Sequence, residues 1–228
     1  MALTAKTLIE RNSLFRGLAA ATLERVVQLA TRRTYEEGTT VFLRGDPGDA
    51  LFGVMTGRVR ISASRAGGKE VFLNIMEPGD AFGEIALLDG SPRTATATAM
   101  ARSELMVLRR EPFFEMLRAE PQLAAHLIQL LCKRVRWTAE LMEDSALLDP
   151  PARLAKRLLT LANVHGRESP EGTRLTLSQE ELAQFLGLSR QMVNQHLQTW
   201  RGKGWIALGR GSVTLVDARA LQKLTQES

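Results

Sequence analysis

The spacing of hydrophobic residues changes along the chain and separates helical stretches from strand-rich ones. Over residues 7–33, apolar residues recur at roughly helical intervals with polar residues between them, which predicts helix. Thr22 is a candidate N-cap for a helix that reaches about Thr31. The apolar positions of this stretch are Leu8, Leu14, Leu18, Leu23, Val26, Val27 and Leu29.

From Thr34 to Arg109 the pattern is one of short β-prone runs separated by glycine turns. Within one run, Val59, Ile61 and Ala63 alternate with polar residues, as expected for a half-buried strand. Many short strands joined by regular turns favour a small barrel or roll. The predicted strands are Thr39–Leu43, Ala50–Met55, Arg58–Ser64, Glu70–Met76, Thr94–Ala99 and Glu104–Leu108.

Residues 111–148 return to helical spacing. Pro112 suits a helix start, and Pro121 either breaks the helix or restarts it. A row of apolar and small polar residues then recurs at alternating steps of three and four residues, and this spacing is typical of an a/d seam. We expect a second copy of the helix to cover this seam in a parallel homodimer; the alternative is that it packs on its own β-roll. The seam residues are Ile128, Leu131, Val135, Thr138, Met142 and Ser145.

The run Leu148–Pro151 breaks this helix and predicts a hinge to a second domain. A helix is expected at Ala152–Val164 and a loop over His165–Gly172. After them we expect a strand at Arg174–Leu177, helices at Gln179–Leu186 and Arg190–Gly202, and a hairpin formed by Trp205–Leu208 and Ser212–Val216. This order predicts a winged helix-turn-helix.

The two helices after Leu177 carry the signals of a helix-turn-helix. Ser178 and Glu181 form a capping box, Gly187 allows the turn, and Ser189 caps the second helix. Arginine can read guanine through two atoms, while Gln and Asn can read adenine or donate to phosphate. The predicted DNA-binding residues are Ser178, Gln179, Ser189, Arg190, Gln191, Asn194, Gln195 and Gln198, with Arg201, Lys203 and Arg210 near phosphates.

Composition narrows the class of protein. With 44% hydrophobic and 24% charged residues the chain reads as globular, and neither a membrane span nor a signal peptide is evident, which predicts a cytoplasmic protein. A single cysteine, Cys132, excludes an iron–sulfur cluster, and three scattered histidines give no metal-ligand spacing, although a haem would need only one. The net charge of the chain is +5, of which residues 149–228 contribute a net +4 and residues 1–148 a net +1.

One short stretch carries most of the chemistry. Glu84 and Arg93 lie nine residues apart, on either side of the turn signal Asp89-Gly90-Ser91. An arginine can hold an anion in a bidentate fork, and backbone amides around Gly83 and a helical turn beginning near Glu84 can face the same anion. A carboxylate such as that of Glu84 does not bind an anion and accepts a hydrogen bond from a hydroxyl instead. The two residues together therefore indicate a ribose phosphate as the ligand.

The stretch Gly83-Glu84-Ile85-Ala86-Leu87-Leu88 with Pro92-Arg93-Thr94-Ala95 resembles the phosphate-binding cassette of cyclic-nucleotide-binding domains. Together with the helix-turn-helix at 176–200, the chain resembles the cyclic-AMP receptor protein / fumarate–nitrate regulator (CRP/FNR) superfamily. The resemblance implies an α+β protein with a β-roll at 1–110, a dimerisation helix at 111–148 and a winged helix-turn-helix at 149–228. It also implies a role as a transcription regulator rather than an enzyme, with no metal.

By the same resemblance, the nucleotide is held by Gly83, Glu84, Ile85, Ala86, Arg93 and Thr94, with Leu73 lining the base pocket and Arg134 and Thr138 on the dimer helix. Two positions leave the base open: Ala139 replaces a family serine that contacts adenine, and Thr94 resembles cyclic-GMP-selective relatives. We expect cyclic AMP, with cyclic GMP and cyclic di-GMP as alternatives.

In the DNA-reading helix, Arg190 matches the first base-reading arginine of the family, whereas Gln191 and Asn194-Gln195 depart from its pattern, so the preferred half-site should differ. The resemblance implies a palindromic double-stranded operator and RNA polymerase as partners, and no membrane. Three rival functions remain: a ligand-independent DNA-binding dimer with a vestigial pocket, a nucleotide phosphodiesterase, and a regulatory module of a kinase or channel.

Overall fold

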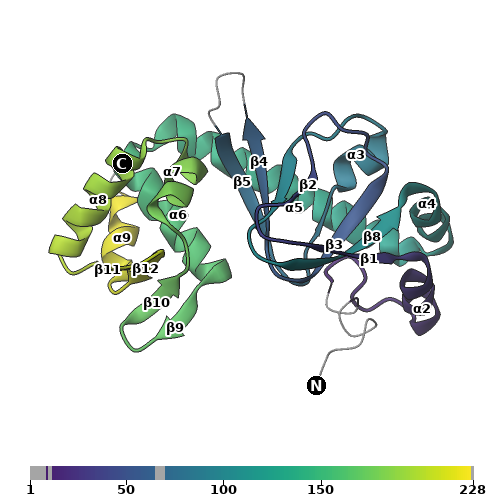
Figure 1. Ribbon diagram of the computed structural model, residues 1–228. Coiled ribbons are helices and arrows are strands. Elements are labelled where there is room, and N and C mark those ends of the chain that lie inside the picture. The colour runs from purple at the N-terminus through teal and green to yellow at the C-terminus, as the bar shows by residue number, and fades with distance from the viewer. Residues whose placement is uncertain (1–8, 10–11, 65–69, 227–228) are drawn as a thin grey trace. The chain divides into compact units, whose positions relative to one another are not determined.

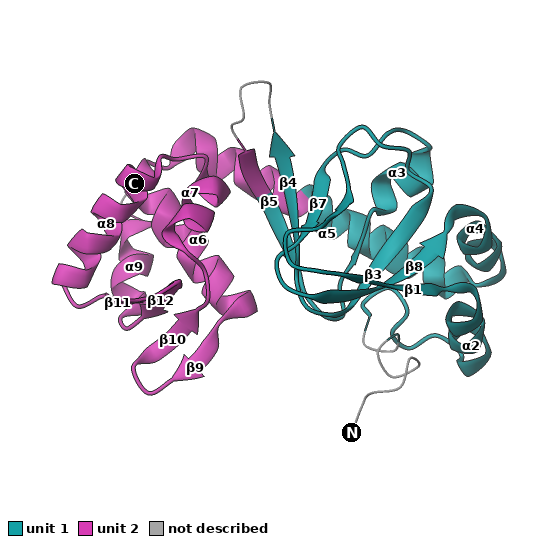
Figure 2. Cartoon of the chain, in the orientation of Figure 1, with its two compact units in different colours: residues 1–68, 73–135 teal, residues 69–72, 136–228 magenta. Residues whose placement is uncertain are grey.

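A computed structural model describes residues 9, 12–64 and 70–226 of the chain (Figure 1). The chain divides into two compact units, coloured separately in Figure 2. Unit 1 comprises residues 1–68 and 73–135, and unit 2 comprises residues 69–72 and 136–228. The division falls within the long helix α5, which spans Pro121–Leu147.

Unit 1 is built on two four-stranded antiparallel sheets that form a β-roll. One sheet has the order β1-β8-β3-β6, and the other has the order β2-β7-β4-β5. The strands are β1 (Thr31–Tyr35), β2 (Thr40–Phe42), β3 (Ala50–Thr56), β4 (Val59–Ser64), β5 (Glu70–Met76), β6 (Ala81–Phe82), β7 (Thr96–Ala99) and β8 (Ser103–Arg109), and the first three residues of β5 are counted in unit 2.

Two apolar clusters stabilise this unit. Inside the roll, Phe52, Val59, Phe82 and Leu105 are among the buried residues contributed by both sheets. A second cluster includes buried residues of α2 (Ala20–Leu29), α4 (Arg110–Ala119) and the start of α5, together with Leu51 and Leu108 of the first sheet. The predicted β-roll is therefore confirmed, with helices on one of its sheets.

The prediction of helix over residues 7–33 is confirmed only in part. Ile9 is helical and Ala20–Leu29 forms helix α2, but residues 12–19 are not helical and Thr31–Tyr35 forms strand β1, which pairs with β8; residues 7, 8, 10 and 11 lie outside the described part of the chain. Four of the five residues of β1 are exposed, so this strand shows no alternation of apolar residues. Thr22 does not cap α2, because the N-cap is Ala19 and the Thr22 hydroxyl donates to Glu120 Oε2.

Two further details of unit 1 differ from prediction. Strand β7 begins at Thr96 rather than Thr94, and the two-residue strand β6 was not predicted. The helical turn near Glu84 is present as α3 (Glu84–Asp89), preceded by Gly83 with a left-handed φ of 82°. Helices α4 and α5 meet at Pro121, which restarts the helix as one of the two alternatives predicted.

The seam residues of α5 are mostly uncovered within one chain. Ile128, Val135 and Met142 are 61%, 69% and 70% exposed, and Leu131 is half-buried. Three large apolar side chains at intervals of seven residues therefore form an exposed stripe, which argues against burial of the seam on the same chain's β-roll.

Unit 2 contains the last part of α5, the helix α6 (Pro150–His165), a helix pair and a small sheet. The sheet has the order β11-β12-β10-β9 and is built from β9 (Arg167–Ser169), β10 (Gly172–Leu175), β11 (Ile206–Gly209) and β12 (Ser212–Leu215). The helix pair is α7 (Gln179–Leu186) and α8 (Arg190–Gly202), and α9 spans Ala218–Leu224. The predicted winged helix-turn-helix is confirmed.

The predicted break at Leu148–Pro151 is confirmed, but α6 begins at Pro150 rather than Ala152 because Asp149 caps it and proline suits the first helical positions. Part of the predicted loop 165–172 is strand β9, and β10 ends at Leu175 instead of Leu177, because its pairing with β12 ends at the Leu175–Val213 pair. Helix α9 was not predicted. No helix among the described residues is long and apolar enough to cross a membrane.

Candidate functional site

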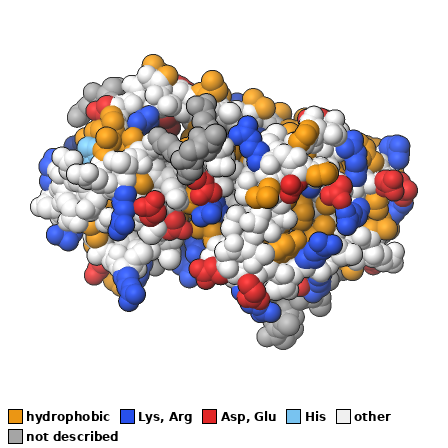
Figure 3. All heavy atoms as spheres, turned by 45° about the horizontal axis from the view of Figure 1, so that its top comes forward, with side chains coloured by type: hydrophobic (Ala, Val, Ile, Leu, Met, Phe, Trp, Pro, Cys, Tyr) orange, Lys and Arg blue, Asp and Glu red, His pale blue; other side chains and the backbone are white. Residues whose placement is uncertain are grey.

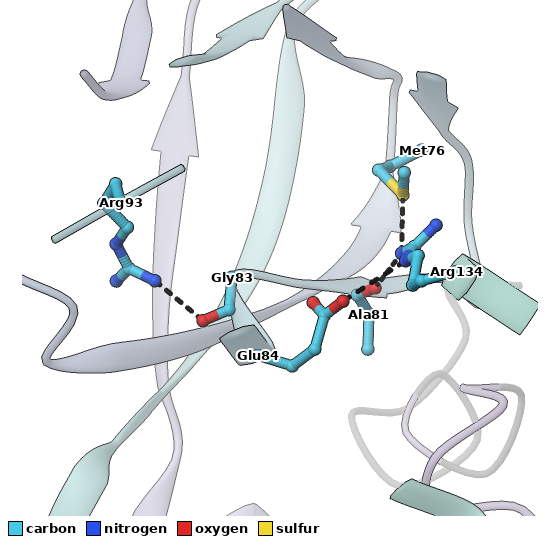
Figure 4. A network of polar contacts seen from close by, with 6 residues as sticks. All are labelled: Met76, Ala81, Gly83, Glu84, Arg93 and Arg134. Carbon is cyan, nitrogen blue, oxygen red and sulfur yellow. Dashed lines mark hydrogen bonds and ion pairs between the residues drawn. The ribbon is translucent and has the colours of Figure 1, made fainter. Parts of the chain in front are cut away.

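Arg93 is buried in the β-roll with only 4% of its surface exposed. Its Nη1 donates to the carbonyl oxygen of Gly83 and its Nη2 to that of Ala50, both at 2.8 Å. Figure 4 shows the guanidinium reaching toward Gly83, directly before helix α3. The two halves of the predicted cassette are therefore joined by a hydrogen bond across ten residues of sequence.

The backbone around Arg93 is fixed by the glycine-rich loop before β3. Arg93 N donates to the carbonyl of Asp46 at 2.8 Å, and Gly45 N donates to the carbonyl of Arg93 at 2.9 Å. Gly48 of the same loop lies so close to Ala86 that an added Cβ would stand 2.3 Å from the Ala86 Cβ. The loop thus holds α3 and the arginine segment together, and this pairing also explains why β7 starts after Thr94.

Aromatic rings and carboxylates surround the guanidinium. The Arg93 Cζ lies 4.4 Å from the centroid of the Phe42 ring and 5.5 Å from that of Phe52, within cation–π range. Burial lowers the pKa of Arg93, while the charges of Asp49, Asp46 and Glu84 oppose this change. Arginine stays charged under such conditions because its unperturbed pKa lies far above neutral pH.

Glu84 is also buried, with 3% of its surface exposed, and it faces α5 rather than Arg93. Its Oε1 accepts a hydrogen bond from Arg134 Nε at 3.2 Å. Arg134 Nη2 donates to the carbonyl of Ala81 at 2.9 Å and contacts the Met76 sulfur at 3.5 Å. Figure 4 shows these contacts on one side of Gly83-Glu84 and Arg93 on the other.

This geometry leaves binding capacity for a ligand. An arginine has five N–H donors, and Arg93 uses two of them on carbonyls. Its Nε is buried without a hydrogen-bond partner in the structure, so a donor remains for an anion. Glu84 accepts a hydrogen bond through Oε1 from the described residues, and a carboxylate offers about four acceptor positions in all.

The other residues predicted for the nucleotide site are placed as follows. Ala86 is buried and Leu73 is half-buried on β5, while Ile85 and Thr94 are exposed. Thr138 lies one helical turn after Arg134 in α5, in the part of that helix that belongs to unit 2. Gly83, Glu84, Arg93 and Arg134 are thus brought together in unit 1, and the roles of all these residues remain predictions.

Sequence reasoning missed three features of this site. The ring of Phe42, the ring of Phe52 and the carbonyl of Ala50 all contact Arg93. The two phenylalanines stand in predicted strands and were available as a signal, since arginine stacks on aromatic faces. Backbone carbonyls that accept from a side chain leave no trace in the sequence.

The helix pair of unit 2 has the geometry expected for reading DNA. The Ser178–Glu181 capping box is present, Gly187 has a left-handed φ of 62°, and the Ser189 hydroxyl accepts from Met192 N. Leu182, Val193 and Leu197 are fully buried. The residues predicted to read DNA from α8 are all exposed: Arg190, Gln191, Asn194, Gln195 and Gln198.

Within this exposed row, Gln198 Nε2 donates to Asn194 Oδ1 at 3.3 Å, so two of the predicted reading side chains are linked. Ser178, Gln179 and Ser189 lie at the N-terminal ends of α7 and α8. Lys203 stands 4.5 Å over the Trp205 ring, and Arg201 and Arg210 are exposed. On the face drawn in Figure 3, basic and acidic side chains are interspersed, so charge alone does not mark a DNA surface there.

Across residues 9, 12–64 and 70–226, no three His, Cys, Asp or Glu side chains come close enough together to hold a metal ion.

Comparison with known proteins agrees with this geometry. Residues 32–120 match the family model of the cyclic nucleotide-binding domain, and residues 152–224 match that of the Crp-like helix-turn-helix domain. The first match contains Gly83, Glu84 and Arg93, and the second contains both helices of the reading pair.

Full-length relatives show the same combination. The CRP-like cAMP-activated global transcriptional regulator of Mycobacterium tuberculosis is 33% identical, over 95% of this chain and 97% of that protein. The cyclic AMP receptor protein of Thermus thermophilus is 33% identical, over 92% of this chain and 95% of the relative. Among solved structures, the c-di-GMP responsive global regulator CLP of Xanthomonas campestris is 27% identical with a TM-score of 0.76, covering 86% of this chain and 99% of that one. The chain therefore belongs to the CRP/FNR family and is a cyclic-nucleotide-binding, DNA-binding transcription regulator.

Proposed function

We propose that this regulator is a homodimer that binds cyclic AMP and then recognises a palindromic DNA operator. The observation that carries the proposal is the buried guanidinium of Arg93, which is held by two carbonyls and still has an unpaired, buried Nε. A charged donor in a sheltered site favours an anion, and the cyclic phosphate of the nucleotide is the anion that fits the family.

The ribose is assigned to Glu84. Its carboxylate accepts from Arg134, which holds it in place, and a carboxylate has further lone pairs for the 2′-hydroxyl. Gly83 allows a close approach, because even a Cβ at this position would stand 2.7 Å from Arg93 Nη1. Gly83, Ile85, Ala86 and Thr94 complete the contact around the phosphoribose, and Leu73 and Thr138 are proposed to contact the base.

Cyclic AMP is preferred because two relatives with one-third identity over nearly the whole chain are named for cAMP. Cyclic di-GMP is the second candidate, since the similar regulator CLP is described as c-di-GMP responsive. Cyclic GMP remains an alternative on account of Thr94, which is exposed beside Arg93, and of Ala139, which offers no hydroxyl.

The dimer is proposed to form along α5. The stripe of Ile128, Val135 and Met142 is exposed within one chain, and a second α5 would cover it in parallel register. Two recognition helices related by a two-fold axis would then enter successive major grooves about 34 Å apart.

We infer that the nucleotide acts by favouring the state of the dimer that binds DNA, through its higher affinity for that state. The change is expected near Asp144–Asp149, where α5 ends and α6 is capped by Asp149. As a regulator of this kind the protein would act in the cytoplasm together with RNA polymerase.

Calorimetry of the purified protein against cyclic AMP, cyclic GMP and cyclic di-GMP tests the proposal. We expect cyclic AMP to bind most tightly, with one site per chain. Tighter binding of cyclic di-GMP or cyclic GMP would mean that this nucleotide, and not cyclic AMP, is the ligand, while the proposed dimeric architecture would stand. If none of the three binds and the protein still recognises DNA, the pocket is vestigial and the dimer is ligand-independent.

A further inference from the structure

A pocket lies in unit 2 where the end of α5 meets α6 and α7. It is a hollow of about 340 Å³ that is partly open to solvent, and it is lined by Asp144, Ser145, Arg153, Arg157 and Phe185, with two leucines. None of these residues belongs to the cluster around Arg93 in unit 1, and none is among the exposed residues of the reading helix α8. The pocket is therefore separate from the proposed nucleotide-binding and DNA-reading residues, although Asp144 and Ser145 belong to the end of α5, where the conformational change is proposed.

Arg157 is the most buried charge of this pocket, with 7% of its surface exposed. Its guanidinium lies 4.7 Å from the centroid of the Trp137 ring and 5.5 Å from that of Phe185. No hydrogen bond from this guanidinium to another described residue is found. Burial lowers the pKa of Arg157, and the charge of Asp144 only partly offsets that effect. Two aromatic faces hold the group, and its donors stay unused.

Arg153 stands one turn before Arg157 on the same face of α6. Its Nε is buried without a hydrogen-bond partner. A buried donor that is left unsatisfied destabilises the folded state, so an acceptor at this place would stabilise the protein. The two neighbouring guanidinium groups thus share a pocket and a lack of acceptors.

The remaining charges do not cancel this pair. Among the described residues, the pocket wall holds two guanidinium groups and one carboxylate, that of Asp144. Because the Asp144 carboxylate already forms an ion pair with Lys156, which lies outside the wall, it does not neutralise the two arginines. The Ser145 side chain in the wall adds a hydroxyl.

We propose that this pocket binds a small phosphate-type oxyanion between Arg153 and Arg157. A tetrahedral oxyanion matches planar guanidinium forks that offer parallel N–H donors, and it can also accept from a hydroxyl such as that of Ser145. The space is sufficient for inorganic phosphate or for the phosphate of a small ester. Because the pocket walls come from α5, α6 and α7, the bound anion would stabilise the packing of the end of α5 against the helix-turn-helix.

The test uses the full-length protein carrying Arg93→Leu, so that the nucleotide pocket does not contribute. Inorganic phosphate is titrated against sodium chloride of equal ionic strength, and the thermal unfolding midpoint and the ³¹P linewidth are measured. We expect phosphate to raise the midpoint and broaden the ³¹P signal. Arg153→Gln should weaken phosphate binding about tenfold, as expected for the loss of one charge-assisted contact.

Two matched variants separate this site from other basic surfaces. Arg167→Gln removes an exposed arginine of β9, and Arg190→Gln removes one from the DNA-reading helix; both should keep the phosphate effect. If Arg153→Gln fails to fold, Ser145→Leu, which fills the pocket from an exposed position, should abolish the effect instead. A titration with glycerol phosphate then separates the sources of the ligand: equal or tighter binding indicates a phosphorylated metabolite, and binding of the inorganic ion alone indicates free phosphate.

The proposal is overturned if phosphate has no more effect than chloride, or if its effect survives both Arg153→Gln and Ser145→Leu. It is also overturned if Arg190→Gln removes the effect, since the anion would then bind on the DNA-reading surface.

Discussion

Arg93 has a structural role in the β-roll and, in the proposed function, a role in binding the ligand. Its two carbonyl contacts hold the start of α3 and the start of β3 in place, and its remaining donors are assigned to the ligand phosphate. The rings of Phe42 and Phe52 cover the guanidinium, so water competes weakly for it. Electrostatic contacts strengthen in such surroundings because the local dielectric constant is lower than that of water.

Replacing Arg93 with leucine should therefore weaken cyclic AMP binding by at least about 2 kcal/mol, the usual effect of removing one partner of a charge-assisted pair. Calorimetry on the folded variant measures this. The control is Arg102→Leu, because Arg102 lies on the surface and pairs with the exposed Glu36. Unchanged affinity in Arg93→Leu would refute the assigned pocket.

The ion pair between Glu84 and Arg134 gives a second expectation. Glu84 is buried, so Arg134→Gln leaves its carboxylate without its charged partner and should destabilise the protein by about 2 kcal/mol. The double variant Glu84→Gln/Arg134→Gln should recover part of the loss, since no unpaired charge remains. Urea unfolding of the wild type, both single variants and the double variant gives the coupling energy. A coupling energy near zero would show that the pair contributes nothing.

The charged residues of the candidate site could be predicted from the sequence, but their contacts could not. Glu84, Arg93 and Arg134 were identified, but the pairing of Arg134 with Glu84 was not, because the two are 50 residues apart and only the packing of α5 on the roll joins them. The same holds for the Ala50 carbonyl, which becomes an acceptor only after β3 and the Arg93 segment are brought together.

At the scale of elements, prediction succeeded where local chemistry specifies the structure. Helices α7 and α8 match their predicted bounds because Ser178, Glu181, Gly187 and Ser189 mark their ends. Strand β1 was mistaken for helix because its residues are polar and exposed, and only pairing with β8, about 70 residues later, makes it a strand. The short strands β6 and β9 were not predicted either. Strand β6 is defined by pairing with β3, which is distant in sequence, and β9 by a brief pairing with β10.

The exposed stripe of α5 leads to a prediction about assembly. Val135→Asp places a charge at the centre of the stripe, where a partner helix would have to bury it, and should convert the dimer to a monomer. The control is Lys133→Asp, an exposed position of the same helix off the a/d seam. Sedimentation velocity reports the mass of each variant. A dimeric Val135→Asp protein, or a monomeric wild type, would contradict an interface along this stripe.

At the scale of the whole molecule, the proposed function links nucleotide binding and DNA binding through a single coupling free energy. If cyclic AMP shifts the dimer toward the DNA-binding state, then DNA must raise the affinity for cyclic AMP by the same factor. Coupling energies of about 1–3 kcal/mol are typical of allosteric proteins, so we expect each ligand to raise the affinity for the other at least about fivefold.

The measurement starts with an operator selected from a random double-stranded pool in the presence of cyclic AMP. Fluorescence anisotropy then gives the affinity for this operator with and without cyclic AMP, and calorimetry gives the affinity for cyclic AMP with and without the operator. Arg190→Gln should weaken operator binding and leave the affinity for cyclic AMP in the absence of DNA unchanged, because Arg190 lies on α8 in unit 2.

Val135→Asp should bind cyclic AMP through the residues of unit 1 and lose the coupling, since one recognition helix reads only one half-site. Equal operator affinity with and without cyclic AMP in the wild type would mean that the pocket and the reading helices are not coupled, even if both bind their ligands.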